Sequence, residues 1–235
     1  MNLENLYTTR IQKTYDEDQV GILSILQANR GGTVKLINYY LGLPLSYPAT
    51  IVAVERGTVD FDVKSEQAFI IDLNRATFIR SPLFTHDVFA SVQYINVKKQ
   101  AASFIDFSYV EIMAERRNFI RMSLNPSPEV TVVSGFGTYS GHLDDLSLSG
   151  VSIRTQTYSP LALDSEATIR FTLSGGGYSP DSDIKVSATL VALKDEAVPY
   201  RYVYSIYPDK SHERLLSQFI FRRQIEIIKE IKNAV

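Results

Sequence analysis

Two short clusters of polar residues in the second half of the chain have the types and spacing to bind phosphate or guanine groups. The first is Arg117-Asn-Phe-Ile-Arg121, and the second, about one hairpin further on, is Asp145-Leu-Ser147-Leu-Ser-Gly150. An arginine guanidinium donates pairs of hydrogen bonds that match a phosphate or the Hoogsteen edge of guanine, and lysine fits these groups less well. Each cluster alone also has a purely structural interpretation, as a solvated basic linker beside Glu115 and as an Asx-type turn between strands. Their occurrence together, in this order, favours a binding site.

Together the two clusters resemble the PilZ family, which is marked by RxxxR at the start of a β-barrel and by [DN]xSxxG shortly after it. Both motifs are intact here, and the resemblance extends over roughly Glu115 to Asn233. It implies a receptor for cyclic di-GMP, with no other cofactor. Arg117 and Arg121 would grip the ligand through charge-assisted hydrogen bonds of about 1.5–3 kcal/mol each. Asp145 would accept from a guanine edge, Ser147 would bond a phosphate or the base, and Gly150 would leave room for the ligand.

Arg116 directly precedes the first motif arginine and adds a third cation. A guanidinium can stack on the face of a guanine base. Members of the family that the motifs resemble differ at this position, and the resemblance implies that an arginine here favours a stacked pair of ligand molecules over a single one. The sequence leaves both stoichiometries open.

Two other functions compete with a nucleotide receptor. A PilZ-like adaptor that binds proteins without nucleotide would be expected to have degenerate motifs, and these are intact. An enzyme could use His142 with Asp144, Asp145 and Ser147, but catalytic triads are built from separate elements and need an oriented nucleophile. We therefore expect no enzyme. Because no histidine has a carboxylate or a second histidine at metal-ligand spacing, we also expect no metal site.

Overall composition argues against several partners. The 235 residues carry 24 lysines and arginines against 26 aspartates and glutamates, a net charge of -2, so we expect no binding to DNA or RNA. The absence of cysteine excludes disulfides and thiolate metal sites, and fits a reducing cytoplasm. The N-terminus lacks a secretory pattern. The longest uncharged stretch, Leu36 to Val54, contains Pro44 and Pro48, which predicts two strands and a turn rather than a membrane span.

The first half of the chain has the short alternating segments, rich in Val, Ile, Phe, Tyr and Thr, that are typical of β-strands. One helix is expected at Gln19–Arg30, where apolar residues recur at helical spacing. The strands are expected at Thr33–Leu41, Thr50–Val54, Thr58–Val63, Ala68–Leu73, Val88–Val97 and Ser103–Ile112. Short strands this close together, without intervening helices, predict a small antiparallel barrel or sandwich for residues 1–112.

Glu115-Arg116-Arg117 interrupts the β pattern, so we place the domain boundary at Met113. The second set of strands is expected at Phe119–Leu124, Val130–Val133, Tyr139–Leu143, Val151–Thr155, Ala167–Leu173, Ile184–Leu193 and Tyr200–Tyr207. An amphipathic helix should follow at Ser211–Asn233, with Ser211 as its N-cap, and a lid on the second barrel is favoured over a partner-binding or dimerisation helix. The expected fold class is therefore mainly β. It comprises an N-terminal PilZN-like barrel (1–112) and a C-terminal PilZ barrel with a helix (113–235), both small and antiparallel.

The resemblance also implies how such a protein would signal. In two-domain proteins of the flagellar-brake kind, the ligand lies at the junction of the barrels and changes their relative orientation. The motif arginines stand where the chain enters the second barrel, which makes such a change physically reasonable. The implied protein is a bacterial second-messenger receptor that acts on a protein partner, at a flagellar motor or another envelope machine, in motility or biofilm-related processes. The partner and the oligomeric state stay open.

Overall fold

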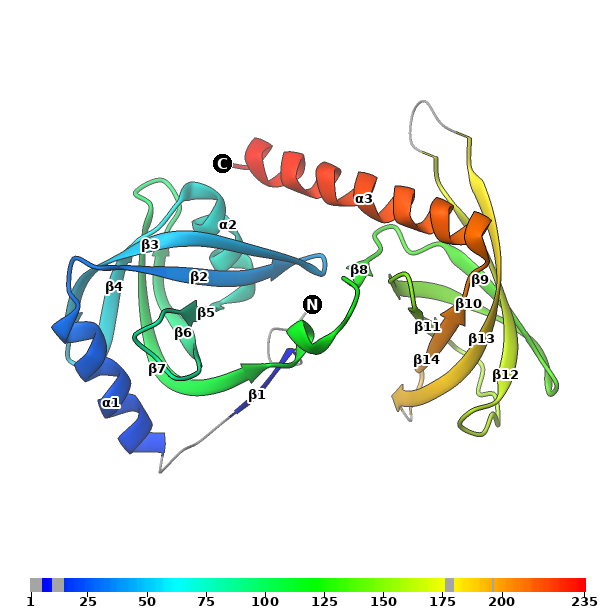
Figure 1. The fold of residues 1–235 in the computed structure, drawn as a ribbon, viewed down its shortest axis with the longest axis horizontal. Coiled ribbons are helices and arrows are strands. Elements are labelled where there is room, and N and C mark those ends of the chain that lie inside the picture. The colour runs from blue at the N-terminus through cyan, green and yellow to red at the C-terminus, as the bar shows by residue number, and fades with distance from the viewer. Residues whose placement is uncertain (1–5, 10–14, 176–179, 196) are drawn as a thin grey trace. The chain divides into compact units, whose positions relative to one another are not determined.

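The protein is mainly β, and its strands form two closed antiparallel barrels of six strands each, as the sequence predicts (Figure 1). The computed structural model describes residues 6–9, 15–175, 180–195 and 197–235. The chain divides into two compact units, one made of Met1–Asn118 with Ile227–Val235 and the other of Phe119–Glu226. The predicted boundary of independently folding domains at Met113 stays a prediction.

The first unit is a barrel closed by β6 and β7. Its ladder runs β7–β4–β3–β2–β5–β6, the pairing of β6 with β7 closes it, and β1 joins β7 outside the ring. Closure leaves fewer unpaired strand edges. Its elements are β1 (Tyr7–Thr9), α1 (Tyr15–Ala28), β2 (Thr33–Tyr40), β3 (Leu43–Glu55), β4 (Thr58–Asp62), α2 (Ser65–Asn74), β5 (Ala76–Arg80), β6 (Asp87–Asn96), β7 (Ala101–Ile112) and the 3₁₀ turn η2 (Met113–Arg116).

The strand predicted at Ala68–Leu73 is wrong, because this segment lies in helix α2. Its buried residues Gln67, Ala68, Ile70 and Ile71 recur at helical spacing rather than in alternation. A short apolar run without clear periodicity does not distinguish a buried strand from a buried helix. The helix ends at Asn74, and Arg75 caps it by adopting φ 57° and donating its backbone N–H to the Ile71 carbonyl.

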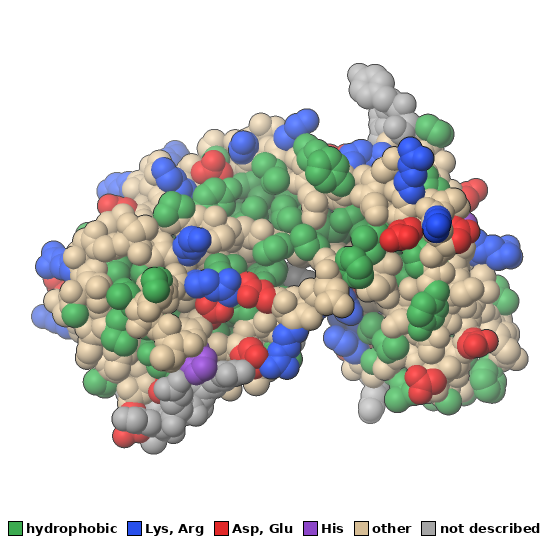
Figure 2. Space-filling view, in the orientation of Figure 1, with side chains coloured by type: hydrophobic (Ala, Val, Ile, Leu, Met, Phe, Trp, Pro, Cys, Tyr) green, Lys and Arg blue, Asp and Glu red, His purple; other side chains and the backbone are tan. Residues whose placement is uncertain are grey.

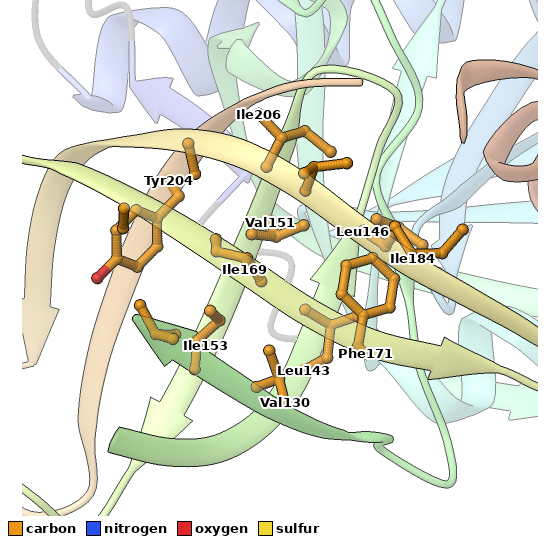
Figure 3. Packing of buried hydrophobic residues seen from close by; sticks show 14 of the residues in the cluster. Val130, Leu143, Leu146, Val151, Ile153, Ile169, Phe171, Ile184, Tyr204 and Ile206 are labelled. Atoms are coloured by element: carbon orange, nitrogen blue, oxygen red, sulfur yellow. The ribbon is translucent and has the colours of Figure 1, made fainter. Parts of the chain in front are cut away.

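The second unit is a barrel closed by β10 and β11, with the ladder β11–β14–β13–β12–β9–β10 and the short strand β8 added to β10. Buried aliphatic and aromatic side chains from all its long strands fill the interior (Figure 3). Its elements are β8 (Met122–Ser123), β9 (Glu129–Ser134), β10 (Gly137–Leu146), β11 (Gly150–Thr155), β12 (Glu166–Leu173), β13 (Ser182–Asp195), β14 (Tyr200–Tyr207) and α3 (Lys210–Asn233). The strand expected at Phe119–Leu124 is reduced to the two residues of β8.

Helix α3 packs on the second barrel through its first turns, where Leu216 joins the buried core cluster. This confirms the lid interpretation for that part of the helix. The predicted N-cap at Ser211 is wrong, because Asp209 caps the helix. The Asp209 carboxylate accepts hydrogen bonds from the backbone N–H groups of Ser211 and His212, both at 2.9 Å, and from the Ser211 hydroxyl at 2.7 Å.

Candidate functional site

A β-bulge in β10 decides which way the second motif faces. Leu143 pairs with Ile153 of β11 and Asp145 pairs with Ser152, so Asp144 is an extra residue with no partner of its own in the register. Leu143 and Leu146 therefore both point into the core, where each is fully buried (Figure 3). In a regular strand, residues three apart face opposite sides. The bulge consequently turns Asp145 to the outer face of the barrel.

Four of the predicted ligand-binding residues belong to the second unit and lie in or next to the ladder of β8, β10 and β11. They are Arg121, Asp145, Ser147 and Gly150. Met122 of β8 pairs with Leu146 at the end of this ladder, and the next residues beyond that pair are Arg121 on one chain segment and Ser147 on the other. Ser147 in turn faces Gly150, because its backbone N–H donates to the Gly150 carbonyl at 2.8 Å. Met122 is fully buried, so strand alternation turns Arg121 outward, to the same face as Asp145. Residues from two separate motifs thus share one outer surface.

The guanidinium of Arg121 is available for a ligand. Within the described ranges of the chain, no hydrogen bond or ion pair engages it, although the residue is only partly exposed. A guanidinium that no protein group engages can form bidentate hydrogen bonds to an anion without first breaking hydrogen bonds within the protein.

Ser147 and Gly150 also serve the turn itself. The Ser147 hydroxyl donates to the Gly150 carbonyl at 3.1 Å, and the residue is 2% exposed. The Ser147 oxygen can therefore accept a hydrogen bond from a base, whereas donation to a phosphate requires it to release that carbonyl. At Gly150, a Cβ atom would lie 3.2 Å from the Tyr204 carbonyl oxygen of β14. Close packing of β11 on β14 thus gives glycine a structural role at this position, besides the predicted room for ligand.

Arg116 and Arg117 belong to the first unit. Arg116 lies in η2, and its Nη2 donates to Glu111 Oε1 at 2.5 Å. Arg117 follows η2 in extended conformation and donates its backbone N–H to the Ala114 carbonyl. Stacking of Arg116 on a base would therefore compete with its ion pair to Glu111.

The neighbouring Glu115 is held in the first unit by a second arginine. Arg80 forms a bidentate pair with Asp87, at 2.7 and 2.6 Å, and also donates to Glu115 Oε2 at 2.8 Å. These hydrogen bonds, first to Asp87 and then to Glu115, raise the pKa of Arg80 above its already high ordinary value. The segment that carries Arg116 is thus tied to the first barrel by two ion pairs.

Two serines that sequence reasoning missed lie in the same row as Asp145. The registers pair Asp145 with Ser123 of β8 on one side and with Ser152 of β11 on the other. Ser152 is 1% exposed, and among the described residues its hydroxyl has no hydrogen-bond partner. The only signal in the sequence is a serine two residues after Gly150, which is too common a pattern to stand out.

The barrel behind the site contains a buried hydroxyl pair, in which the phenol groups of Tyr139 and Tyr204 are hydrogen-bonded to each other. Burial raises the pKa of Tyr204 to about 12 and raises that of Tyr139 further, with the Tyr204 hydrogen bond as a second cause. Both groups are therefore neutral at physiological pH, which makes this pair part of the packed support of β14.

The residues of the competing enzyme hypothesis are not assembled for catalysis. His142 is exposed on β10, where the registers pair it with Glu129 and Arg154. The Ser147 hydroxyl donates to a backbone carbonyl and not to this histidine. Among the described residues, no group of three or more His, Asp or Glu side chains is arranged to hold a metal ion. No helix in the described part of the chain combines the length and apolar character needed to cross a bilayer.

Charges of both signs are interspersed on the surface. On the face that Figure 2 shows, lysine and arginine side chains lie among acidic and apolar ones. This mixture of signs agrees with the net charge of -2.

Three solved structures resemble most or all of the chain. The chain is similar to the solved structure of YcgR from Escherichia coli in complex with c-di-GMP, with 16% identity over 100% of both chains and a TM-score of 0.45. It is similar to the inhibitor of motility MotI/DgrA of Bacillus subtilis, with 11% identity, 84% of this chain and 97% of that chain covered, and a TM-score of 0.43. The MrkH–c-di-GMP complex of K. pneumonia gives 12% identity, 95% and 99% coverage and a TM-score of 0.44. No curated protein matches the chain significantly. Residues 115–222, which include both motifs, match the family model of the PilZ domain.

Proposed function

We propose that this protein is a receptor for cyclic di-GMP and that Arg117, Arg121, Asp145, Ser147 and Gly150 bind the ligand. The observation that carries the proposal is the β8–β10–β11 ladder. On one face of the barrel it combines an outward-facing aspartate, a tight glycine turn and Arg121, whose guanidinium has no partner among the residues that the structure describes. The family match over residues 115–222 supports the same ligand.

The chemistry of this face suits a guanine nucleotide. Arg121 can grip a phosphate or the Hoogsteen edge of a guanine through two parallel hydrogen bonds. A carboxylate such as Asp145 can accept from the N1–H and N2–H groups of the base. The Ser147 oxygen, whose proton is already donated, adds one acceptor. Binding and release of the nucleotide require no bond to be made or broken, so we expect saturable binding without turnover.

Calorimetric titration of cyclic di-GMP into the wild type and into Arg121→Ala tests the proposal. Loss of charge-assisted hydrogen bonds worth about 1.5–3 kcal/mol should weaken binding by roughly 10- to 150-fold. Arg170→Ala is a matched control, since Arg170 is an exposed arginine on β12 of the same barrel, and it should bind like the wild type. Absence of binding by the wild type at micromolar ligand would refute the proposal and favour the nucleotide-independent adaptor.

The stoichiometry of the same titration addresses Arg116. If Arg116 exchanges Glu111 for a guanine face, the wild type should bind two ligand molecules per chain and Arg116→Ala only one. A plateau at one ligand per wild-type chain would contradict the stacked pair.

We further propose that binding changes the relative orientation of the two domains and that the bound state acts on a protein partner in motility or biofilm formation. The proposed ligand contacts divide between the units, with Arg117 in the first and Arg121 in the second. A ligand that engages both arginines restricts the chain between them. Distance distributions between spin labels on the two domains should therefore shift on addition of ligand in the wild type and stay unchanged in Arg121→Ala.

A further inference from the structure

The extra residue of the β10 bulge is held by a network of charges next to the proposed site. Arg154 of β11 donates from Nη2 to Asp144 Oδ1 at 2.5 Å. Arg201 of β14 places its Nε 3.6 Å from Asp144 Oδ2 and 3.2 Å from Asp195 Oδ2. The Asp144 side chain is only 14% exposed, although it is on the outer face of the barrel. Two arginines on two neighbouring strands therefore fix one carboxylate.

The backbone of Asp144 is fixed as well. Its carbonyl accepts the N–H of Leu124, directly after β8, at 2.9 Å. The same residue thus ties the bulge to β11 and β14 through its side chain and to the β8 segment through its backbone. This segment also contains Arg121, so the bulge connects the two halves of the proposed site.

The bulge has a direct effect on Asp145. If Asp144 were accommodated in a regular ladder, strand alternation would turn Asp145 toward the core and Leu146 outward. Neighbouring carboxylates at 144 and 145 also repel each other, and the arginines beside Asp144 offset that repulsion.

We infer that Asp144 is a positioning residue, which acts through its ion pairs with Arg154 and Arg201 to hold the bulge that presents Asp145 to the ligand. This inference rests on the proposed function, since Asp145 is taken as a ligand contact. Asp144 itself is assigned no contact with the nucleotide.

A double-mutant cycle on cyclic di-GMP affinity tests the inference. Asp144→Ala should raise Kd about tenfold. Asp144→Asn, which keeps an acceptor for Arg154 but loses the charge, should give a smaller increase. In the Asp145→Ala background, Asp144→Ala should cause no further loss, because the residue it positions is absent. A merely structural role would lower affinity equally in both backgrounds.

The remaining variants keep the test decisive. Asp183→Asn, an acid on the outer face of β13 that accepts from Thr172 at 2.7 Å, is the control and should bind like the wild type. If Asp144→Ala does not fold, Arg154→Met removes the main partner of Asp144 instead and should also weaken binding. Wild-type affinity in both Asp144→Ala and Arg154→Met, or an undiminished effect in the Asp145→Ala background, would overturn the inference. Absence of binding by the wild type would refute the proposed function instead.

Discussion

Replacing three glycines of the PilZ barrel by alanine should give three graded effects that follow from the space at each position. A Cβ at Gly135 meets nothing within 4 Å, one at Gly150 lies 3.2 Å from the Tyr204 carbonyl oxygen, and one at Gly141 lies 2.6 Å from the Arg154 carbonyl oxygen. None of these three glycines has a positive φ that would add strain of its own. The chemical change is the same single methyl group in each case, so only the surroundings differ.

The distances set the expected magnitudes. At Gly135, alanine restricts the unfolded chain and should stabilise the fold by about 0.5 kcal/mol. At Gly150, β14 must move by a few tenths of an ångström, which we expect to cost about 1 kcal/mol. At Gly141, a backbone carbonyl of the closed ladder must be displaced, at a cost of about 3 kcal/mol.

Urea denaturation followed by circular dichroism measures these costs. With a slope of about 2 kcal/mol per molar urea, the midpoint should rise by about 0.2 M for Gly135→Ala and fall by about 0.5 M and 1.5 M for Gly150→Ala and Gly141→Ala. Equal midpoints for Gly141→Ala and Gly135→Ala would refute the packing argument. Ligand affinity of the folded Gly150→Ala protein separates its two roles, because a glycine needed only for β14 leaves Kd unchanged.

Four further predictions concern the tyrosine pair, the helix cap and the first helix. Tyr204→Phe and Tyr139→Phe should each lower the free energy of unfolding, measured by urea denaturation, by about 1–3 kcal/mol, because each leaves one buried hydroxyl without its partner. The double variant should be close to the wild type in stability. Additive losses in the double variant would contradict the pairing. The free energy of unfolding of the wild-type protein should also fall as the pH rises above 10 toward 12. Because the pKa of Tyr204 is raised to about 12, the folded state keeps a proton that the unfolded state releases in this range. The hydrogen bonds to Asp209, first from the His212 backbone N–H, lower the pKa of Asp209 from 3.8 to about 2. NMR should therefore show its carboxyl group titrating near pH 2, and the stabilisation of α3 by this cap should be lost as the pH falls through that value. A titration midpoint near 3.8 would show that the cap does not form. Gly21→Ala, in the middle of α1 with nothing within 4 Å, should raise thermal stability by about 0.5–1 kcal/mol, and destabilisation would indicate a contact at that position.

The sequence predicts the β-rich architecture well, because its strand segments alternate apolar and polar residues and are rich in the β-branched and aromatic residues that favour strands. It fails at Ala68–Leu73, where six mostly apolar residues suit a buried strand and a buried helix equally, and only packing decides for α2. It also misplaces the cap of α3, since Asp209 and Ser211 are both good N-cap residues and two positions apart. Both errors occur where the local sequence suits two structures equally well and tertiary contacts select one of them.

The sequence names candidate residues for the proposed site but does not predict their geometry. The motif residues Arg121, Asp145 and Gly150 stand out by type and spacing, whereas their shared face depends on the bulge at Asp144 and on the pairing of β8. A bulge adds one residue without any change in composition, so alternation in the sequence cannot locate it. Ser152 is missed for the same reason, because its position opposite Asp145 is a property of the register.

The shortness of β8 has a consequence for how the site opens. Two residue pairs join β8 to β10, while the barrel itself is closed by β10 and β11. The segment that holds Arg121 can therefore detach without unfolding the six-stranded ring, at the cost of its hydrogen bonds and of exposing the buried side chains of Met122 and Leu124. Only molecules with β8 attached hold Arg121 next to the Met122–Leu146 pair, and under the proposed function the apparent affinity for ligand scales with their fraction. Substitutions around Met122 and Leu124 would then tune the ligand concentration at which the proposed receptor responds, while every proposed contact residue stays the same.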